Sequence, residues 1–233
     1  MPALHLYESW VPPAAVLVSL VAVVLILASG KWPNLREAWT LLAAGLKFVL
    51  VVSLVPGVLA GHVATFAFVE IVPGVALALK ADALGVLFAL VASGLWIVTS
   101  VYSMGYMRGN GEKEQTRYFA SFALSLSATL GIAFAANLVT FLIFYELLTL
   151  ATYPLVVHKG TAEAIRAGRM YLAYALTAGL VFLVASGWIY LTTGNLDFQP
   201  GGMLPDGVIS PNGLRALFVL FLVGVGVKSG LMP

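Results

Sequence analysis

The chain has 233 residues, of which 61% are hydrophobic and only 9% are charged. A typical soluble domain is roughly 45–50% apolar and about 25% charged. This composition excludes a soluble globular enzyme, a disordered chain and a nucleic-acid binder, and it indicates a polytopic membrane protein. The sequence contains no cysteine, which excludes disulfides and cysteine-ligated zinc or iron–sulfur centres, and we expect no cofactor.

Several stretches are apolar and long enough to cross a bilayer as helices, because a helical span takes about 20 residues. They lie near 12–29, 39–60, 84–105, 118–136, 138–157, 163–192 and 213–233. The expected fold class is therefore all-α, a transmembrane bundle of about seven helices. The connection 61–83 alternates around Pro73-Gly74, which predicts a small β-hairpin on the outer surface, with an irregular loop as the alternative.

The basic residues predict an orientation, because inner loops of membrane proteins are enriched in lysine and arginine. With the N-terminus outside, the outer connections hold only Lys80 and Arg215. The inner connections hold Lys31, Arg36, Arg108, Lys113, Arg117, Lys159, Arg166 and Arg169.

Glu146 is the most informative charge within a predicted span. It lies nine residues past Asn137, which corresponds to roughly 13 Å of depth in a hydrocarbon core of about 30 Å. Such a charge costs about 2.5–3.5 kcal/mol, so intramembrane acids are usually functional. Burial favours the neutral form of a carboxyl group, whereas a nearby cation favours the carboxylate. A carboxyl group under both influences can take up and release a proton. The alternative is a structural carboxyl group.

Two lysines also fall inside predicted spans. Lys228 lies among Gly224, Gly226, Gly230 and Pro233, a density of glycine and proline that predicts a broken seventh helix. Discontinuous helices recur at ion-coupling sites, so Lys228 is a candidate for proton exchange, with snorkelling to the interface as the alternative. Lys47 is predicted to snorkel towards the inner face and to be structural.

Other polar residues are candidates for a supporting role. Thr149 and Tyr153 share the helical face of Glu146, and His158 at the inner end of that helix is a candidate for proton entry. Polar stripes on two other predicted helices indicate helix–helix contacts, or alternatively water beside Glu146. These stripes are Ser93, Trp96, Ser100 and Ser103, and Tyr171, Tyr174 and Thr177.

Several segments together resemble the antiporter-like subunits of Mrp-type cation/proton antiporters, respiratory complex I and membrane-bound hydrogenases. They are 82–88, 100–107, Arg117-Tyr-Phe, Phe144-Tyr-Glu146-Leu-Leu, 167–172 and 193–196. The D subunit of the Mrp type is the most similar. In this family the fifth helix carries a glutamate and the broken seventh helix a lysine, so the resemblance implies that Glu146 and Lys228 form a coupled pair in proton translocation.

The resemblance also implies an organisation and a setting. Residues 1–81 would form N-terminal transmembrane helices with the outer hairpin, and 82–233 the first part of an antiporter-like core. Since family members continue past the seventh helix, the sequence is expected to be truncated. The implied protein is a non-enzymatic ion-translocating subunit in a bacterial inner membrane, with other membrane subunits and lipid as partners. It would carry protons, with sodium left open.

Three alternatives stay open. One is that the chain is a subunit of a complex I-type, hydrogenase-linked or inorganic-carbon-uptake complex instead of an antiporter. Another is that it is a non-conducting scaffold. A redox subunit such as a cytochrome b would need paired intramembrane histidines for haem, whereas His5, His62 and His158 lie at or outside helix ends.

Overall fold

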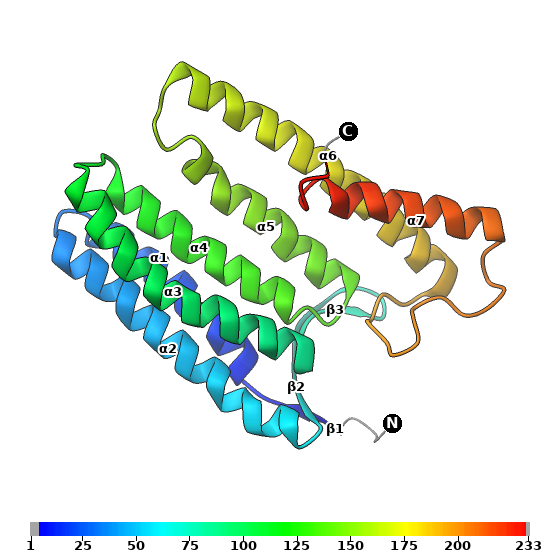
Figure 1. Ribbon diagram of the computed structural model, residues 1–233. Helices are drawn as coiled ribbons and strands as arrows, with labels where there is room; N and C mark the ends of the chain where they lie inside the picture. Colours follow the sequence, from blue (N-terminus) through cyan, green and yellow to red (C-terminus); the bar gives the residue numbers. More distant parts are fainter. Residues whose placement is uncertain (1–4, 232–233) are drawn as a thin grey trace.

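A computed structural model describes residues 5–231 of the chain, and Figure 1 shows this part as a bundle of long helices with a small sheet at one end. The strands are β1 (His5–Glu8), β2 (His62–Val72) and β3 (Val75–Ala81). The helices are α1 (Val11–Ala28), α2 (Pro33–Leu59), α3 (Ala83–Gly109), α4 (Gln115–Ala133), α5 (Leu138–Val156), α6 (Ala162–Thr193) and α7 (Pro211–Gly226). The predicted all-α class with about seven helices and a small sheet is confirmed for the described residues.

Short polar residues fix where the helices begin. The side chains of Asp82, Asn137, Thr161 and Ser210 each accept a hydrogen bond from a backbone N–H in the first turn of α3, α5, α6 and α7. Such caps satisfy donors that have no partner within the helix. Proline lies in the first turn of α1, α2 and α7, where its missing N–H costs nothing.

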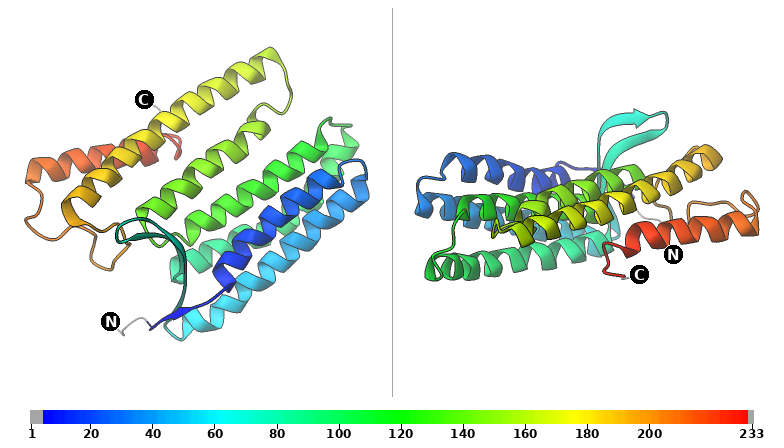
Figure 2. Two further views of the ribbon diagram at one scale, coloured as in Figure 1. Left: turned by 180° about the vertical axis from the view of Figure 1, so that it is seen from behind. Right: turned by 90° about the horizontal axis from the view of Figure 1, so that it is seen from above.

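Five helices, α1, α2, α3, α5 and α6, are long and apolar enough to cross a membrane. α7 is apolar but shorter, with 16 residues. α4 is more polar, yet it packs against α1 and α5 in the middle of the bundle, as Figure 2 shows from two further sides. Its hydroxyls are satisfied by backbone carbonyls: Ser125 and Thr129 donate one turn back, and Ser127 donates to Val16 of α1 at 2.9 Å. α4 therefore needs less apolar surface than its neighbours.

The sheet confirms the predicted hairpin and adds a strand to it. β2 and β3 pair antiparallel around the turn at Pro73-Gly74, where Gly74 has a φ of +79°. β1 pairs parallel with the start of β2, from His5 opposite His62 to Glu8 opposite Thr65. The sheet is joined to the bundle because Asn137, which caps α5, also donates to the carbonyl of Ala76 in β3 at 2.7 Å.

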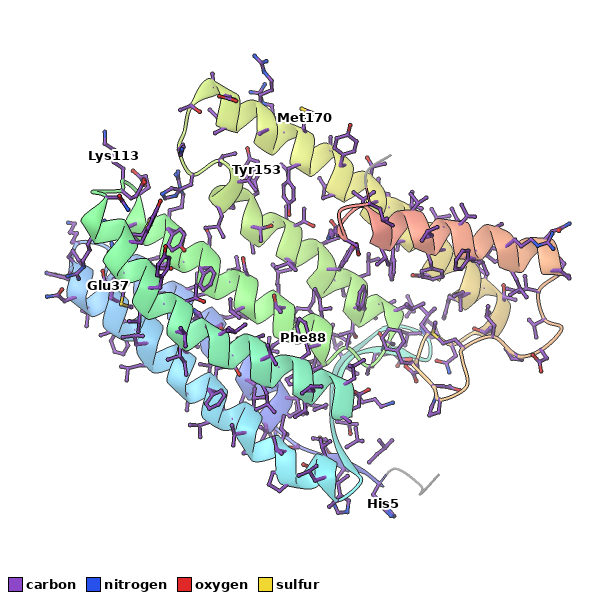
Figure 3. All side chains as sticks on the ribbon, viewed as in Figure 1. His5, Glu37, Phe88, Lys113, Tyr153 and Met170 are labelled. Carbon is purple, nitrogen blue, oxygen red and sulfur yellow. The ribbon has the colours of Figure 1, made fainter. Side chains whose placement is uncertain are left out.

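The bundle has two chemically different ends. The sheet end holds the sheet together with the α4–α5 and α6–α7 connections. The basic end holds the α1–α2, α3–α4 and α5–α6 connections, and these connections together with the adjoining helix ends carry eight of the twelve arginines and lysines. Figure 3 shows Glu37 and Lys113 at the basic end and His5 at the sheet end. Which end faces the cytoplasm stays a prediction.

An ion-pair cluster joins three helices at the basic end. Glu37 on α2 is 9% exposed at its side chain and lies 3.3 Å from the Arg36 guanidinium and 2.7 Å from that of Arg108 on α3. Arg36 also donates to Gln115 and Thr116 at the start of α4. The buried carboxylate therefore holds α2, α3 and α4 at this end.

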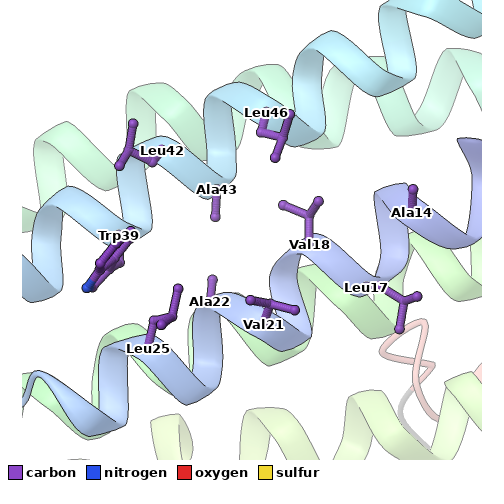
Figure 4. A pocket seen from close by; sticks show the side chains of 10 residues that line it. All are labelled: Ala14, Leu17, Val18, Val21, Ala22, Leu25, Trp39, Leu42, Ala43 and Leu46. Atoms are coloured by element: carbon purple, nitrogen blue, oxygen red, sulfur yellow. The ribbon is translucent and has the colours of Figure 1, made fainter.

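A groove between α1 and α2 opens on the outer face of the bundle. Figure 4 shows its apolar side chains, which include Leu17, Val21, Leu42 and Leu46 along its walls. Such side chains suit contact with lipid tails or another apolar helix, and the groove offers no polar group for chemistry.

Candidate functional site

Glu146 lies midway along α5, with the helix fixed at its start by the Asn137 cap. Its side chain is 27% exposed, and it points towards the region where α5, α6 and the end of α7 meet. A carboxylate at this depth of an apolar bundle needs a counter-charge or hydrogen-bond donors to remain ionised.

Lys228 supplies that counter-charge. α7 ends at Gly226, and a turn that runs to Gly230, with a φ of +79°, follows it. The Lys228 Nζ lies 3.3 Å from Oε1 of Glu146. It also donates to the backbone carbonyl of Tyr145 at 2.5 Å and lies 3.3 Å from the centroid of the Tyr145 ring. The ammonium group is therefore held by a carboxylate, a carbonyl and an aromatic face, all from one turn of α5.

Tyr145, which the sequence analysis did not single out, connects three helices around this pair. Its ring is stacked with that of Phe182 on α6 at 6.0 Å, and its hydroxyl donates to the carbonyl of Gly224 on α7 at 2.9 Å. Gly224 packs directly on Phe182, where an added Cβ would come within 2.9 Å of the Phe182 Cβ. The end of α7 that carries Lys228 is thus positioned against both α5 and α6.

Gly179 on α6 was also not expected from the sequence. A Cβ at this position would overlap the Glu146 carboxyl group, so only glycine lets the carboxylate lie against the α6 backbone. The other carboxylate oxygen, Oε2, is buried and has no hydrogen-bond partner among the described residues. One oxygen of Glu146 therefore pairs with Lys228, while the other is left for a proton or a water molecule.

The predicted supporting residues fall into two groups. Thr149 is buried and its hydroxyl donates to the same Tyr145 carbonyl at 3.3 Å, so it lies beside the pair. Tyr153 contacts α6 two turns away, at Gly168. Tyr174 is 58% exposed on α6, so among the described residues it does not line the Glu146 site, and its supporting role stays a prediction. Tyr171 occupies the inward position instead and shares a 2.7 Å hydrogen bond with Thr152 of α5.

His158 lies at the basic end, after α5. Its ring contacts that of Tyr118 on α4 edge-on at 5.9 Å, and its carbonyl accepts a hydrogen bond from Arg117 at 2.9 Å. The Nδ1 atom is buried and unpartnered within residues 5–231. His158 is therefore set between α4 and α5 at the end of the bundle from which a proton is predicted to enter.

Lys47 does not snorkel, so this prediction is wrong. Its side chain is fully buried, with its Nζ donating to the carbonyl of Leu126 on α4 at 3.1 Å and lying 5.2 Å from the Trp96 ring centroid. The α3 stripe that includes Trp96 is buried between helices, as expected of helix–helix contacts, and not beside Glu146. Tertiary packing of α4 against α2 provides a nearer acceptor than the interface.

The site brings together two groups that can each carry a proton. The carboxyl group of Glu146 and the ammonium group of Lys228 lie within ion-pair distance where α5 meets the end of α7. Within the described residues, no group of three His, Asp or Glu side chains is arranged to hold a metal ion.

Residues 135–233, which include both members of the pair, match the family model described as "NADH:quinone oxidoreductase/Mrp antiporter, TM". This segment is a domain of that family. The resemblance drawn from the sequence motifs is confirmed, and the chain is a multi-pass membrane protein. The family comprises ion-translocating membrane subunits of larger complexes.

Two curated relatives illustrate the range of the family. Hydrogenase-4 component B of Escherichia coli (strain K12) is 31% identical over 160 residues, which cover 67% of this chain and 23% of the relative. The D subunit of the Na(+)/H(+) antiporter of Bacillus subtilis (strain 168) is 28% identical over 160 residues, covering 66% of this chain and 31% of the relative. The chain thus spans less than a third of the length of these relatives.

The fold is similar to that of one component of a solved respiratory complex. A chain in the structure of the membrane-bound sulfane sulfur reductase, an archaeal respiratory membrane complex, superposes with a TM-score of 0.77. The alignment covers 94% of this chain and 45% of that chain, at 18% sequence identity. The similarity therefore extends to α1–α3, which lie before the segment matched by the family model.

Proposed function

We propose that this chain is a proton-conducting membrane subunit of a multisubunit monovalent cation/proton antiporter. The observation that carries the proposal is the Glu146–Lys228 ion pair, set midway along α5 in a bundle of membrane-spanning length. The similarity to the D subunit of a Na(+)/H(+) antiporter supports the antiporter setting. Protons are the transported species in this subunit, and other membrane subunits complete the complex.

In the proposed mechanism, the position and charge of Lys228 control whether Glu146 is protonated. With Lys228 close, its ammonium group favours the carboxylate form of Glu146. When Lys228 moves away or gives up its proton, the desolvated carboxylate takes up a proton instead. Lys228 lies on the turn after α7, beyond the last helical residue Gly226, so the proposed move does not require α7 itself to unwind. In this proposal the proton enters from the basic end, past His158 and the Thr152–Tyr171 hydrogen bond.

The proposed setting is a bacterial inner membrane, with the N-terminus outside. The basic end then faces the cytoplasm, which accords with the enrichment of lysine and arginine in inner loops. We also propose a division into residues 1–81 and an antiporter-like core from residue 82 onwards, because the segments that carry the family resemblance begin at residue 82.

A second candidate is an antiporter-like subunit of a hydrogenase-linked or complex I-type respiratory assembly. The 31% identity to hydrogenase-4 component B and the fold of the sulfane sulfur reductase chain favour it. The same pair would conduct protons there, but redox chemistry in partner subunits would drive it.

The test compares Glu146→Gln with Glu146→Asp in the complete complex, expressed in its native membranes. Glutamine keeps the shape of the side chain but carries no exchangeable acidic proton, so proton flux is expected to fall by about 100-fold or more. Aspartate keeps the acid and should retain measurable flux. Flux is followed as the decay of a pH gradient in inside-out vesicles, with and without added sodium, and complex assembly is checked by native gel.

A Glu146→Gln complex that assembles and transports at the native rate contradicts the proposal and favours a scaffold role. If the flux that Glu146→Gln abolishes is driven by added sodium, the result supports the antiporter. If that flux is driven by a redox substrate, the result supports the respiratory candidate.

A further inference from the structure

Lys47 is a second buried ammonium group, in a part of the bundle that the Glu146–Lys228 pair does not reach. It lies midway along α2 and is 0% exposed. The structure provides it with one hydrogen bond, to the Leu126 carbonyl, and with the face of Trp96. An ammonium group has three N–H donors, so these two contacts leave its polar requirements unmet.

No carboxylate compensates this charge. α1, α3 and α4 contain no Asp or Glu along their lengths. On α2 the only acid is Glu37, which lies ten residues earlier, or about 15 Å along the helix axis, and which already pairs with Arg36 and Arg108. The other titratable groups on the packed helices lie towards the basic end, namely Tyr102, Tyr106 and Arg108 on α3 and Arg117 and Tyr118 on α4.

Three more polar atoms in the same four-helix region are buried without a partner among the described residues. They are Ser19 Oγ on α1 and Trp96 Nε1 and Ser100 Oγ on α3, and each of these residues is at most 1% exposed. Ser19 is three residues before Ala22, and Lys47 is three residues after Ala44, so each shares a helical face with its neighbour. Ala22, Ala44 and Trp96 belong to one core cluster, so Ser19 and Lys47 each lie about one helical turn from a member of the cluster that contains Trp96.

Buried polar groups in native proteins nearly always have a partner, and ordered water supplies it where protein groups do not. A water molecule typically makes two to four hydrogen bonds. The Lys47 ammonium and the Trp96 indole can donate to water, and the two serine hydroxyls can donate or accept.

We propose that Lys47, Ser19, Trp96 and Ser100 surround a small group of ordered water molecules between α1, α2, α3 and α4, and that Lys47 exchanges its proton with this water. In this step an N–H bond of the ammonium breaks and the proton passes to a water molecule, which becomes hydronium. The electron pair stays on the neutral amine, and the reverse step restores the ammonium. Lys47 is then a second protonatable site in the chain. Its part in transport rests on the proposed proton-conducting function.

The water itself is tested on the native complex by hydroxyl-radical labelling, in which radicals formed from water by radiolysis oxidise neighbouring side chains. Trp96 is the probe and is read by mass spectrometry. Phe134 is the control, because it is 0% exposed and lies in a core cluster without unpartnered polar atoms. We expect Trp96 to be labelled several-fold faster than Phe134. Labelling of Trp96 no faster than Phe134 overturns the proposal.

Proton exchange is tested with Lys47→Arg, which keeps the positive charge but holds its proton at any relevant pH. Proton flux in the assembled complex is expected to fall by about 100-fold. Lys47→Gln, which is shorter and neutral, is measured alongside it in case the larger guanidinium prevents assembly. Native flux in either assembled variant overturns the role in proton exchange.

The two proposals fail separately. If Glu146→Gln transports normally while Trp96 is labelled, the hydrated lysine site stands and the proposed function falls. If Glu146→Gln loses flux while Lys47→Arg does not, the proposed function stands and proton exchange at Lys47 falls.

Discussion

The two halves of the bundle hold a buried ammonium group in different ways. In the α5–α7 half, Lys228 faces Glu146 at 3.3 Å, and the lysine lies on a turn beyond the helix end. In the α1–α4 half, Lys47 lies within a continuous helix and meets a carbonyl and an aromatic ring. In the proposed mechanism the Glu146–Lys228 pair can change its separation, whereas a single charge within a packed helix can change only its protonation. Substitutions in each half of the bundle test this contrast.

The largest effect on stability is expected at the basic end of the α1–α4 half. Glu37→Gln removes the charge that holds Arg36 and Arg108, and it should lower the free energy of unfolding by about 3 kcal/mol. Proton flux per assembled complex should change little, because Glu37 lies about 15 Å along α2 from Lys47 and pairs with Arg36 and Arg108 instead. Thermal unfolding of the detergent-solubilised complex measures the stability, with Glu163→Gln on the exposed start of α6 as the control. A native melting temperature for Glu37→Gln would show that the cluster is not a structural anchor.

Lys228→Met breaks the pair in the other half. The pair is partly exposed, so we expect a loss of about 2 kcal/mol, below the range for fully buried pairs, together with loss of proton flux. Adding Glu146→Gln to this variant should restore part of the stability, since the unpaired carboxylate is then gone. The comparison is a double-mutant cycle in chemical unfolding. Strictly additive losses would mean that the two side chains do not interact in the membrane.

Gly179→Ala tests the close approach of Glu146 to α6. The added methyl group overlaps the carboxyl group, so overpacking should cost about 1–2 kcal/mol and lower proton flux by displacing Glu146 from Lys228. Gly187→Ala is the matched control, because it lies two turns further along α6, where an added Cβ meets nothing within 4 Å. It should be neutral or slightly stabilising. Equal behaviour of the two variants would contradict the packing of Glu146 against α6.

Tyr145→Phe gives the smallest expected effect. It removes the hydroxyl that donates to Gly224 but keeps the ring beneath Lys228, so stability should fall by about 1 kcal/mol and flux only modestly. Tyr145→Leu removes the ring as well and should reduce flux further. If Phe and Leu behave alike, the aromatic face does not help to hold the ammonium group.

The helices and the hairpin could be predicted from the sequence because their signals are local. Apolar length and the turn at Pro73-Gly74 are both recognised within one segment. β1 could not be predicted in this way. It has only four residues, and its partner strand begins at His62, more than fifty residues later.

The site was only partly predictable for the same physical reason. Glu146 and Lys228 stand out because charges are costly in an apolar span. Gly179 and Tyr145 matter through contacts between helices, which no spacing within one helix reveals. The wrong prediction that Lys47 snorkels has the same cause, since neighbouring helices decide which side of α2 is buried. The signal available for Tyr145 was its position next to Glu146.

The most direct measurement is infrared difference spectroscopy of the complete complex between two pH values, with Glu146→Gln as the reference. The proposal predicts a protonated-carboxyl band that appears on acidification in the native complex and is absent from the variant. The same band in both complexes, together with native proton flux in the variant, would show that Glu146 is not the proton carrier.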